Sequence, residues 1–188
     1  QGGALIVRYA QAIDEIPRLA LELGVSAVFA NRDYEPQAKL RDQLVASSLA
    51  RHAIGFENFK DHALLDGAEV LTQSGRAFTV YTPYRKAWLK RLCEEDLASH
   101  ALVPGRLISP PVDSGVPMLE TIGFQTTDLR RTGVRPGMSG ARQQTDDFRS
   151  RIAQYADLRD FPANNGGSGL SVHLRFGTVS IRALAAQA

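Results

Sequence analysis

The first third of the chain alternates short apolar runs with a stretch whose apolar residues follow a helical period. Residues 4–7 and 27–30 are the apolar runs, and each predicts a buried strand. Between them, four apolar residues share one helical face at i, i+3, i+4 and i+7: Ile16, Leu19, Ala20 and Leu23. Gly24 then predicts the end of that helix. This alternation is typical of a parallel sheet with crossover helices, so the sequence predicts an α/β fold.

The strand predicted at 27–30 is followed by a polar loop and another helix. Residues 31–35 form the loop, and Pro36 suits the first turn of the helix, which carries Leu40 and Leu44. A third strand is predicted over residues 54–59. Thr82 and Pro83 have the form of a helix cap followed by proline at the first helical position, so a further helix is predicted there. Because ligands bind at the carboxyl ends of strands in open parallel sheets, the loop is a candidate binding site.

Helical periodicity is absent from residues 99–140, where Pro, Gly and Ser accumulate. We interpret this stretch as a segment that crosses between two domains. Order returns at Thr145, which is predicted to cap a helix with three apolar residues on one face. The sequence therefore predicts an α/β domain over residues 1–98, an interdomain segment over 99–140, and the start of a helical domain over 141–188.

A glycine-rich turn follows that helix. Residues 166–171 are Gly-Gly-Ser-Gly-Leu-Ser. Glycines allow close approach of the backbone, and free amides at the start of a helix attract an anion, so the turn is a candidate phosphate site. The hydroxyls of Ser168 and Ser171 would add donors. An ordinary loop, with Ser171 as a helix cap, is the alternative that these residue types leave open. The next helix is predicted to end at Gly177, and Ser180 to cap another.

The composition is that of a globular protein, with 44% hydrophobic and 22% charged residues. The 22 Lys and Arg residues nearly balance 20 Asp and Glu, so no overall field indicates a nucleic acid or a membrane, and a DNA contact must come from a local patch. The single cysteine, Cys93, excludes an internal disulfide and favours the cytoplasm, and we expect it to have a packing role. No apolar run approaches the roughly 20 residues of a membrane span. The four histidines lack metal-site spacing, and no Ser/His/Asp order indicates a hydrolase.

Several motifs in order resemble the DNA photolyase/cryptochrome family. Residues 155–182 resemble the opening of that family's FAD-binding domain, and they include Tyr155, Arg159, the glycine-rich turn and Arg182. Upstream, residues 31–36 and 81–89 resemble its amino-terminal antenna domain. The resemblance covers nearly the whole chain outside residues 99–140. It implies a Rossmann-like parallel sheet with flanking helices, a crossing segment, and the start of an all-α FAD-binding domain.

The resemblance also implies roles for particular residues. FAD would be bound in a bent form, with its phosphates at the turn, by Tyr155, Gly167, Ser168, Gly169, Leu170 and Ser171. Arg159 would contact a backbone phosphate of DNA. The residue types alone leave other interpretations open: Tyr155 as a core aromatic and Arg159 as a solvated surface charge. No catalytic residue can be named, and no metal site is expected.

The chain departs from the family pattern at two sites. Gly167 and Gly169 stand where the family commonly has Thr and Arg or Lys, so we expect an FAD site that is weaker or compensated elsewhere. Gln37 and Ala38 stand where folate-using relatives have Asn and Glu, so we do not expect folate to bind in that mode. Asp33 resembles an acidic residue of deazaflavin-binding relatives, but it is equally explained as the cap of a turn. The identity of a second, antenna chromophore stays open.

The resemblance implies a photolyase that repairs cyclobutane pyrimidine dimers in UV-damaged DNA, using light and reduced FAD. A cryptochrome photoreceptor with the same fold is the alternative, and a flavodoxin-like nucleotide-binding module unrelated to light is a third. We expect a monomer without a membrane partner. The start lacks Met and the last predicted helix lacks a stop signal, so we expect the protein to extend at both ends and this chain alone to be inactive.

Overall fold

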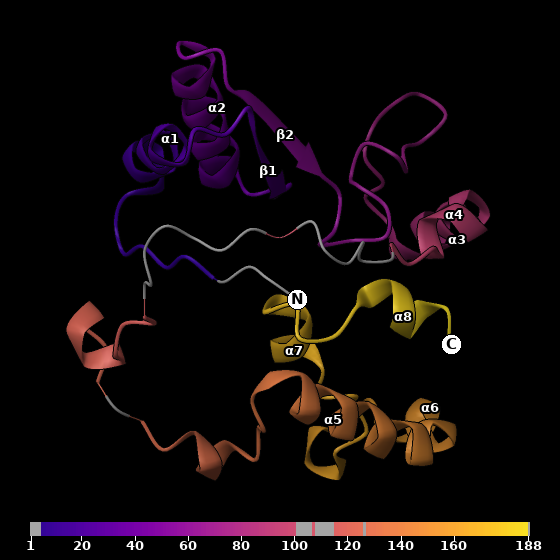
Figure 1. Cartoon of the computed structure of the whole chain (residues 1–188). Helices are drawn as coiled ribbons and strands as arrows, with labels where there is room; N and C mark the ends of the chain where they lie inside the picture. Colours follow the sequence, from indigo (N-terminus) through magenta and orange to yellow (C-terminus); the bar gives the residue numbers. More distant parts are fainter. Residues whose placement is uncertain (1–4, 101–106, 108–114, 126, 188) are drawn as a thin grey trace. The chain divides into compact units, whose positions relative to one another are not determined.

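Figure 1 shows the computed structural model of the chain, which describes residues 5–100, 107, 115–125 and 127–187. The chain divides into two compact units. The first comprises residues 1–61 and 100–126, and the second comprises residues 62–99 and 127–188. The domain boundaries predicted at 98 and 140 stay a prediction.

The first unit contains two parallel strands and two helices. Its elements are, in order, α1 (Ala12–Leu23), β1 (Ala27–Asn31), α2 (Pro36–Ala50) and β2 (Gly55–Phe59). The strands pair in parallel, with Ala27 opposite Gly55. Because two parallel strands cannot be joined by a tight turn, the chain between them must cross over, and α2 forms that crossover. The strands predicted at 27–30 and 54–59 are confirmed, as are the two helices and the α/β fold class.

The core of this unit lies between the helices and the strands. α1 packs on α2, and α2 packs on β2 (Figure 1). Val45 and Leu49, on one face of α2, are 1% and 0% exposed, and they form a cluster with Ala20 and Ile54. In α1, apolar positions that predicted the helix do pack, since Ile16 and Ala20 belong to this cluster. In α2 they do not, because Leu40 and Leu44 are 57% and 48% exposed and Val45 and Leu49 are buried instead.

Local signals set the helix ends as predicted. Gly24 has φ 63°, and its N–H bonds to the carbonyls of Ala20 and Leu21 at the end of α1. A residue with a Cβ would be strained in this left-handed conformation. Pro36 is the first residue of α2, where a missing N–H costs no hydrogen bond.

The strand predicted at residues 4–7 is wrong for the part that the structure describes, since residues 5–9 belong to no strand or helix. Leu5 is 74% exposed. An apolar run becomes a strand only where a neighbouring strand satisfies its backbone groups. Among the described residues the sheet contains β1 and β2 and no third strand, so residues 5–7 pair with neither of them.

The second unit is helical among its described residues. Its α-helices are α3 (Tyr81–Arg91), α4 (Glu94–Leu97), α5 (Gly137–Arg151), α6 (Tyr155–Leu158), α7 (Ser171–Arg175) and α8 (Ile181–Ala185). Single 3₁₀ turns occupy Leu129–Thr132, Ile152–Gln154 and Pro162–Asn164, and a fourth, Leu119–Ile122, lies in the first unit. α5 packs against α7, and α4 packs against α8.

Two predicted helix starts are wrong. α3 begins at Tyr81 with Val80 at its N-cap, so Thr82 lies in the first turn and is not the cap. Pro83 is compatible with this start because N–H groups of the first turn have no intrahelical acceptor. α5 begins at Gly137, and Thr145 lies inside it, where its hydroxyl donates to the Ala141 carbonyl at 2.8 Å. Threonine tolerates a helix interior through such a bond to the preceding turn.

The earlier start of α5 extends helix into the stretch predicted to be irregular. Of that stretch, residues 101–106, 108–114 and 126 lie outside the described residues. The helix predicted from residue 170 is confirmed as α7, and Gly177 follows it with φ 63°. Ser180 caps α8, because its Oγ accepts the Ala183 N–H at 3.3 Å. Across the ranges that the structure covers, no helix is long and apolar enough to cross a membrane.

Candidate cofactor site

The predicted phosphate site is a turn that packs against α6. We call residues 164–171, which join the 3₁₀ turn at Pro162–Asn164 to α7, the Gly/Ser turn. Asn165 and Gly169 both have positive φ, 47° and 67°. A Cβ on Gly166 would lie 2.5 Å from the backbone carbon of Leu158, so only glycine lets the turn approach α6 this closely. The turn is thus held at a defined place in the second unit.

The carbonyl oxygens of the turn are bound by two side chains of α5. Gln144 donates from Nε2 to the Ser168 carbonyl at 2.7 Å. Arg151 donates from Nη1 to the Asn165 carbonyl and from Nη2, at 3.1 Å, to the Gly167 carbonyl. Its Nε also contacts Asp147 at 3.0 Å. Three carbonyls of the turn are therefore directed at α5.

The amides of the turn are left without acceptors. Within the described ranges, the N–H groups of Gly166, Gly167, Ser168 and Gly169 donate no hydrogen bond. The Leu170 N–H makes only a long contact, 3.4 Å, with Ser168 Oγ. Successive free amides on a turn whose carbonyls are bound elsewhere form a donor surface that suits an anion.

A mostly apolar pocket of about 350 Å³ lies beside the turn. Ser168 and Leu170 are the turn residues in its lining. The other lining residues come from α5, the following 3₁₀ turn, α7, α8 and Gln187: Thr145, Phe148, Arg149, Ile152, Leu174, Ile181, Leu184, Ala185 and Gln187. Drug-sized ligands occupy pockets of about 300–1,000 Å³, so this pocket has room for only part of a dinucleotide.

The predicted site residues do not all meet there. Tyr155 is 41% exposed and packs edge-on against Phe148, with ring centroids 6.0 Å apart. It therefore touches the pocket lining without being part of it. Ser171 is the first residue of α7 and not its cap, since Leu170 holds that position without a side-chain bond. Arg159 lies on the surface and contacts the adjacent Asp160 at 3.7 Å.

The two glycines that depart from the family pattern have different surroundings. A Cβ on Gly167 would meet nothing within 4 Å. Gly169 has φ 67°, and a Cβ there would lie 2.8 Å from Gln144 Nε2. A side chain at 169 would therefore be strained and would displace the Gln144 amide, whereas one at 167 would be accommodated.

The sequence prediction missed Gln144 and Arg151. They are seven residues apart, which places them on the same face of one helix. The sequence feature that could have indicated them is this spacing, together with the polar turn that follows the helix. It could not be used while the helix was predicted to start at Thr145, because Gln144 then lay outside it.

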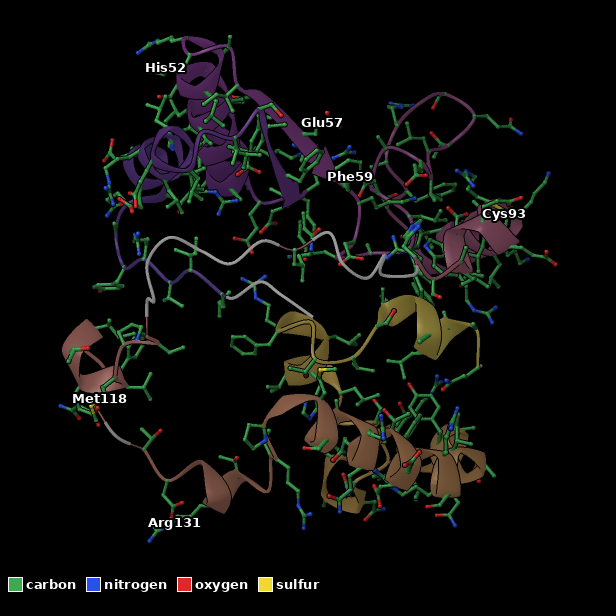
Figure 2. All side chains as sticks on the ribbon, viewed as in Figure 1. His52, Glu57, Phe59, Cys93, Met118 and Arg131 are labelled. Carbon is green, nitrogen blue, oxygen red and sulfur yellow. The ribbon has the colours of Figure 1, made fainter. Side chains whose placement is uncertain are left out.

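The second candidate region is the carboxyl end of the strands, in the first unit. Asp33 Oδ1 accepts the N–H groups of Tyr34 and Glu35, at 2.7 and 3.1 Å. It therefore caps the turn after β1, which is the plainer of its two interpretations. Phe59, at the end of β2 (Figure 2), stacks on Phe29 with centroids 6.0 Å apart. Among the described residues, no group of three His, Cys, Asp or Glu side chains could hold a metal ion.

Comparison with known proteins agrees with these motifs. A deoxyribodipyrimidine photo-lyase from Synechococcus sp. is 35% identical over 174 residues, which is 89% of this chain and 36% of the relative. The corresponding protein of Vibrio cholerae is 34% identical over 171 residues, again 89% and 36%. The chain therefore spans about a third of the length of these curated relatives.

Solved structures give the same result. A bacterial class III photolyase from Agrobacterium tumefaciens superposes with a TM-score of 0.77 and 27% identity, over 97% of this chain and 38% of that one. A cryptochrome from Synechocystis sp. also gives 0.77, over 99% and 40%, and at 17% identity this shows similarity of fold alone. The model of the DNA photolyase family matches residues 1–102, more than half of the 188 residues. The chain belongs to the DNA photolyase family.

Proposed function

We propose that the protein carrying this chain repairs cyclobutane pyrimidine dimers in DNA, using light and reduced FAD. The relatives named deoxyribodipyrimidine photo-lyase support this reaction. Because the chain corresponds to about a third of their length, the repair activity would also depend on residues other than those of this chain. The chain's own part in the reaction would be to bind the cofactor and the DNA backbone.

The observation that carries the proposal is the donor surface of the Gly/Ser turn. Free N–H groups from Gly166 to Gly169 would donate to the diphosphate oxygens of FAD. The Ser168 hydroxyl would add one donor, and the apolar pocket beside Leu170 would receive an uncharged part of the cofactor. Ser171 and Tyr155 would contact FAD at the edges of this site. When bound, reduced FAD would supply the electron that splits the dimer.

DNA would be held through its backbone. Arg159 has a half-exposed side chain whose ion pair with Asp160, at 3.7 Å, is longer than a hydrogen bond, so its guanidinium can approach a phosphate. Such contacts position the duplex without reading its sequence. An enzyme that does chemistry on a base inside a duplex must first take that base out of the stack, so the damaged pair would leave the helix to reach the flavin.

The direct test is light-dependent repair. The purified full-length protein, with reduced FAD, would be mixed with an oligonucleotide that contains one pyrimidine dimer and exposed to near-UV light. The proposal expects dimers to be lost under light and kept in the dark. A protein that binds flavin and dimer-containing DNA but leaves the dimers intact under light would refute it.

That refuting result would favour the second candidate, a cryptochrome photoreceptor. The equal TM-scores of 0.77 to a photolyase and to a cryptochrome keep this candidate open, since one fold serves both.

An antenna chromophore is also proposed, of unspecified kind. Because Gln37 and Ala38 carry no carboxylate, folate is not proposed. A cytoplasmic, monomeric protein is part of the same proposal.

A further inference from the structure

We infer that Arg151 and Gln144 are the positioning residues of the cofactor site: by binding the carbonyls of the Gly/Ser turn, they orient its amides towards the diphosphate. This inference rests on the proposed function, because the diphosphate is that of FAD. Neither residue needs to touch the cofactor. Their role is to fix the backbone that does.

The glycine-rich backbone of the turn needs such support. A glycine-rich turn has many accessible conformations, and only some of them direct successive N–H groups to one side. Ordering such a segment costs about 1–2 kcal/mol of conformational entropy for each residue. A turn that is ordered before the ligand arrives avoids part of that cost at the moment of binding.

The contacts of Arg151 meet this requirement. Its planar guanidinium bridges two carbonyls of the turn, those of Asn165 and Gly167, while its Nε is held by Asp147. It also lies over the Phe148 ring, with its central carbon 5.6 Å from the centroid. The Arg151 side chain is 21% exposed, so these contacts are partly shielded from water. A guanidinium fixed on four sides can hold two carbonyls in one orientation, which a flexible lysine cannot do.

Gln144 completes the arrangement at the other end of the turn. Its amide donates to the Ser168 carbonyl at 2.7 Å, one residue beyond the Gly167 carbonyl that Arg151 holds. The two side chains thus bind consecutive carbonyls from one face of α5. Because each peptide group directs its C=O and N–H in opposite directions, fixing these carbonyls towards α5 turns the N–H groups of the following residues away from it.

The test uses conservative variants of the full-length protein and three probes. FAD contains both the diphosphate and the isoalloxazine, ADP contains the diphosphate alone, and riboflavin lacks phosphate. The dissociation constants of all three are measured on flavin-free protein. Arg151→Lys keeps the charge and loses the bridge. Arg142→Lys makes the same change at an exposed position of α5 and serves as its control.

We expect Arg151→Lys to weaken the binding of FAD and ADP by roughly tenfold and that of riboflavin by less than twofold, because about one charge-assisted hydrogen bond is lost from the support of the phosphate donors alone. Arg142→Lys should change the binding of none of the three. Equal losses for riboflavin and ADP would show that Arg151 only stabilises the fold, and unchanged FAD and ADP binding would also overturn the inference.

A second pair keeps the inference testable if Arg151→Lys does not fold. Gln144→Met removes the donor and keeps the shape, and Gln143→Met is its neighbour outside the site, since Gln143 is bonded to Arg135. Gln144→Met should weaken the binding of FAD and ADP selectively, and an equal effect of both variants would contradict this. Failure of the proposed repair reaction is distinguishable, because it appears as dimers that persist under light, whereas failure of the inference appears in the dissociation constants of FAD and ADP.

Discussion

Exchanging Gly166 for alanine should destabilise the second unit, although the substitution adds one methyl group. The new Cβ would lie 2.5 Å from the Leu158 backbone carbon, 2.7 Å from its Cβ and 2.7 Å from its carbonyl oxygen. Non-bonded carbons normally approach to about 3.5–4.0 Å, so the overlap is about 1 Å. Two of the three atoms are backbone and cannot rotate away, so the turn must move off α6. Overpacking of this kind costs about 1–3 kcal/mol.

The adjacent Gly167 provides the control. A Cβ there meets nothing within 4 Å, and the φ of Gly167 is outside the left-handed region. Gly167→Ala should therefore be neutral or stabilise by up to about 1 kcal/mol, because alanine restricts the unfolded chain. The two neighbouring alanine variants should differ by about 2–3 kcal/mol in the free energy of unfolding.

Urea unfolding of the 188-residue chain, followed by the fluorescence of Trp88, measures this difference. Trp88 lies in the same compact unit as Gly166. With a urea dependence of about 1–3 kcal/mol per molar, the two midpoints should lie about 1 M apart. Coincident midpoints for the two variants would refute the packing argument, because both substitutions add the same methyl group.

Four further results are expected. Leu49→Ala should lower the free energy of unfolding by about 2–5 kcal/mol, since Leu49 is 0% exposed, whereas Leu44→Ala, at 48% exposure, should cost much less; equal urea midpoints would contradict this. Hydrogen bonds to the carboxylates of Glu95 and then Asp96 raise the pKa of the Cys93 thiol above its ordinary 9.0, so the pH midpoint of its alkylation should lie above that value and fall in Glu95→Gln. An unshifted midpoint in the variant would refute that cause. Gly167→Thr in the full-length protein should bind FAD about 2- to 10-fold more tightly than Gly167→Val, which has the same shape without the hydroxyl donor. The isolated 188-residue chain should retain negligible flavin after purification, and a stoichiometric yellow protein would prove this wrong.

The elements that the sequence predicted correctly depend on neighbours in the chain. α1 follows from apolar residues at helical spacing with Gly24 as its end signal, and α2 follows from Pro36 at its first turn. The start of α5 was missed because residues 137–144 carry few apolar side chains, and only Gly140 and Ala141 of this helix are buried. A polar helix lacks the periodic spacing of apolar residues by which a helix is predicted from sequence.

The role of Cys93 was also not predictable from its residue type alone. It was predicted to have a packing role, yet it is exposed, at the start of α4 (Figure 2), where it takes part in a capping box with Asp96. Cysteine is not among the residue types that usually predict a helix cap. A residue whose role depends on a side chain three positions ahead is identified only when both are considered together.

The sequence predicted the residue types of the candidate site but not the side chains that hold its turn in place. The Gly/Ser turn is visible as a cluster of glycines, but the side chains that hold it act over 24 residues for Gln144 and 16 for Arg151. Contacts at such separations leave no periodic trace in one sequence. The orientation of the turn, which decides whether its amides can bind an anion, was therefore not predictable from the turn alone.

The glycines of the turn differ in what requires them, and only one position is free to change. Gly166 is required by the backbone of Leu158, and Gly169 by its own φ and by the amide of Gln144. Gly167 is required by neither. A hydroxyl donor can therefore be gained at 167 without any other change, whereas a side chain at 169 would strain the backbone, displace the Gln144 amide and release the Ser168 carbonyl. Gly169 and Gln144 are therefore coupled, because a change at residue 169 would also change the contact that Gln144 makes with the turn.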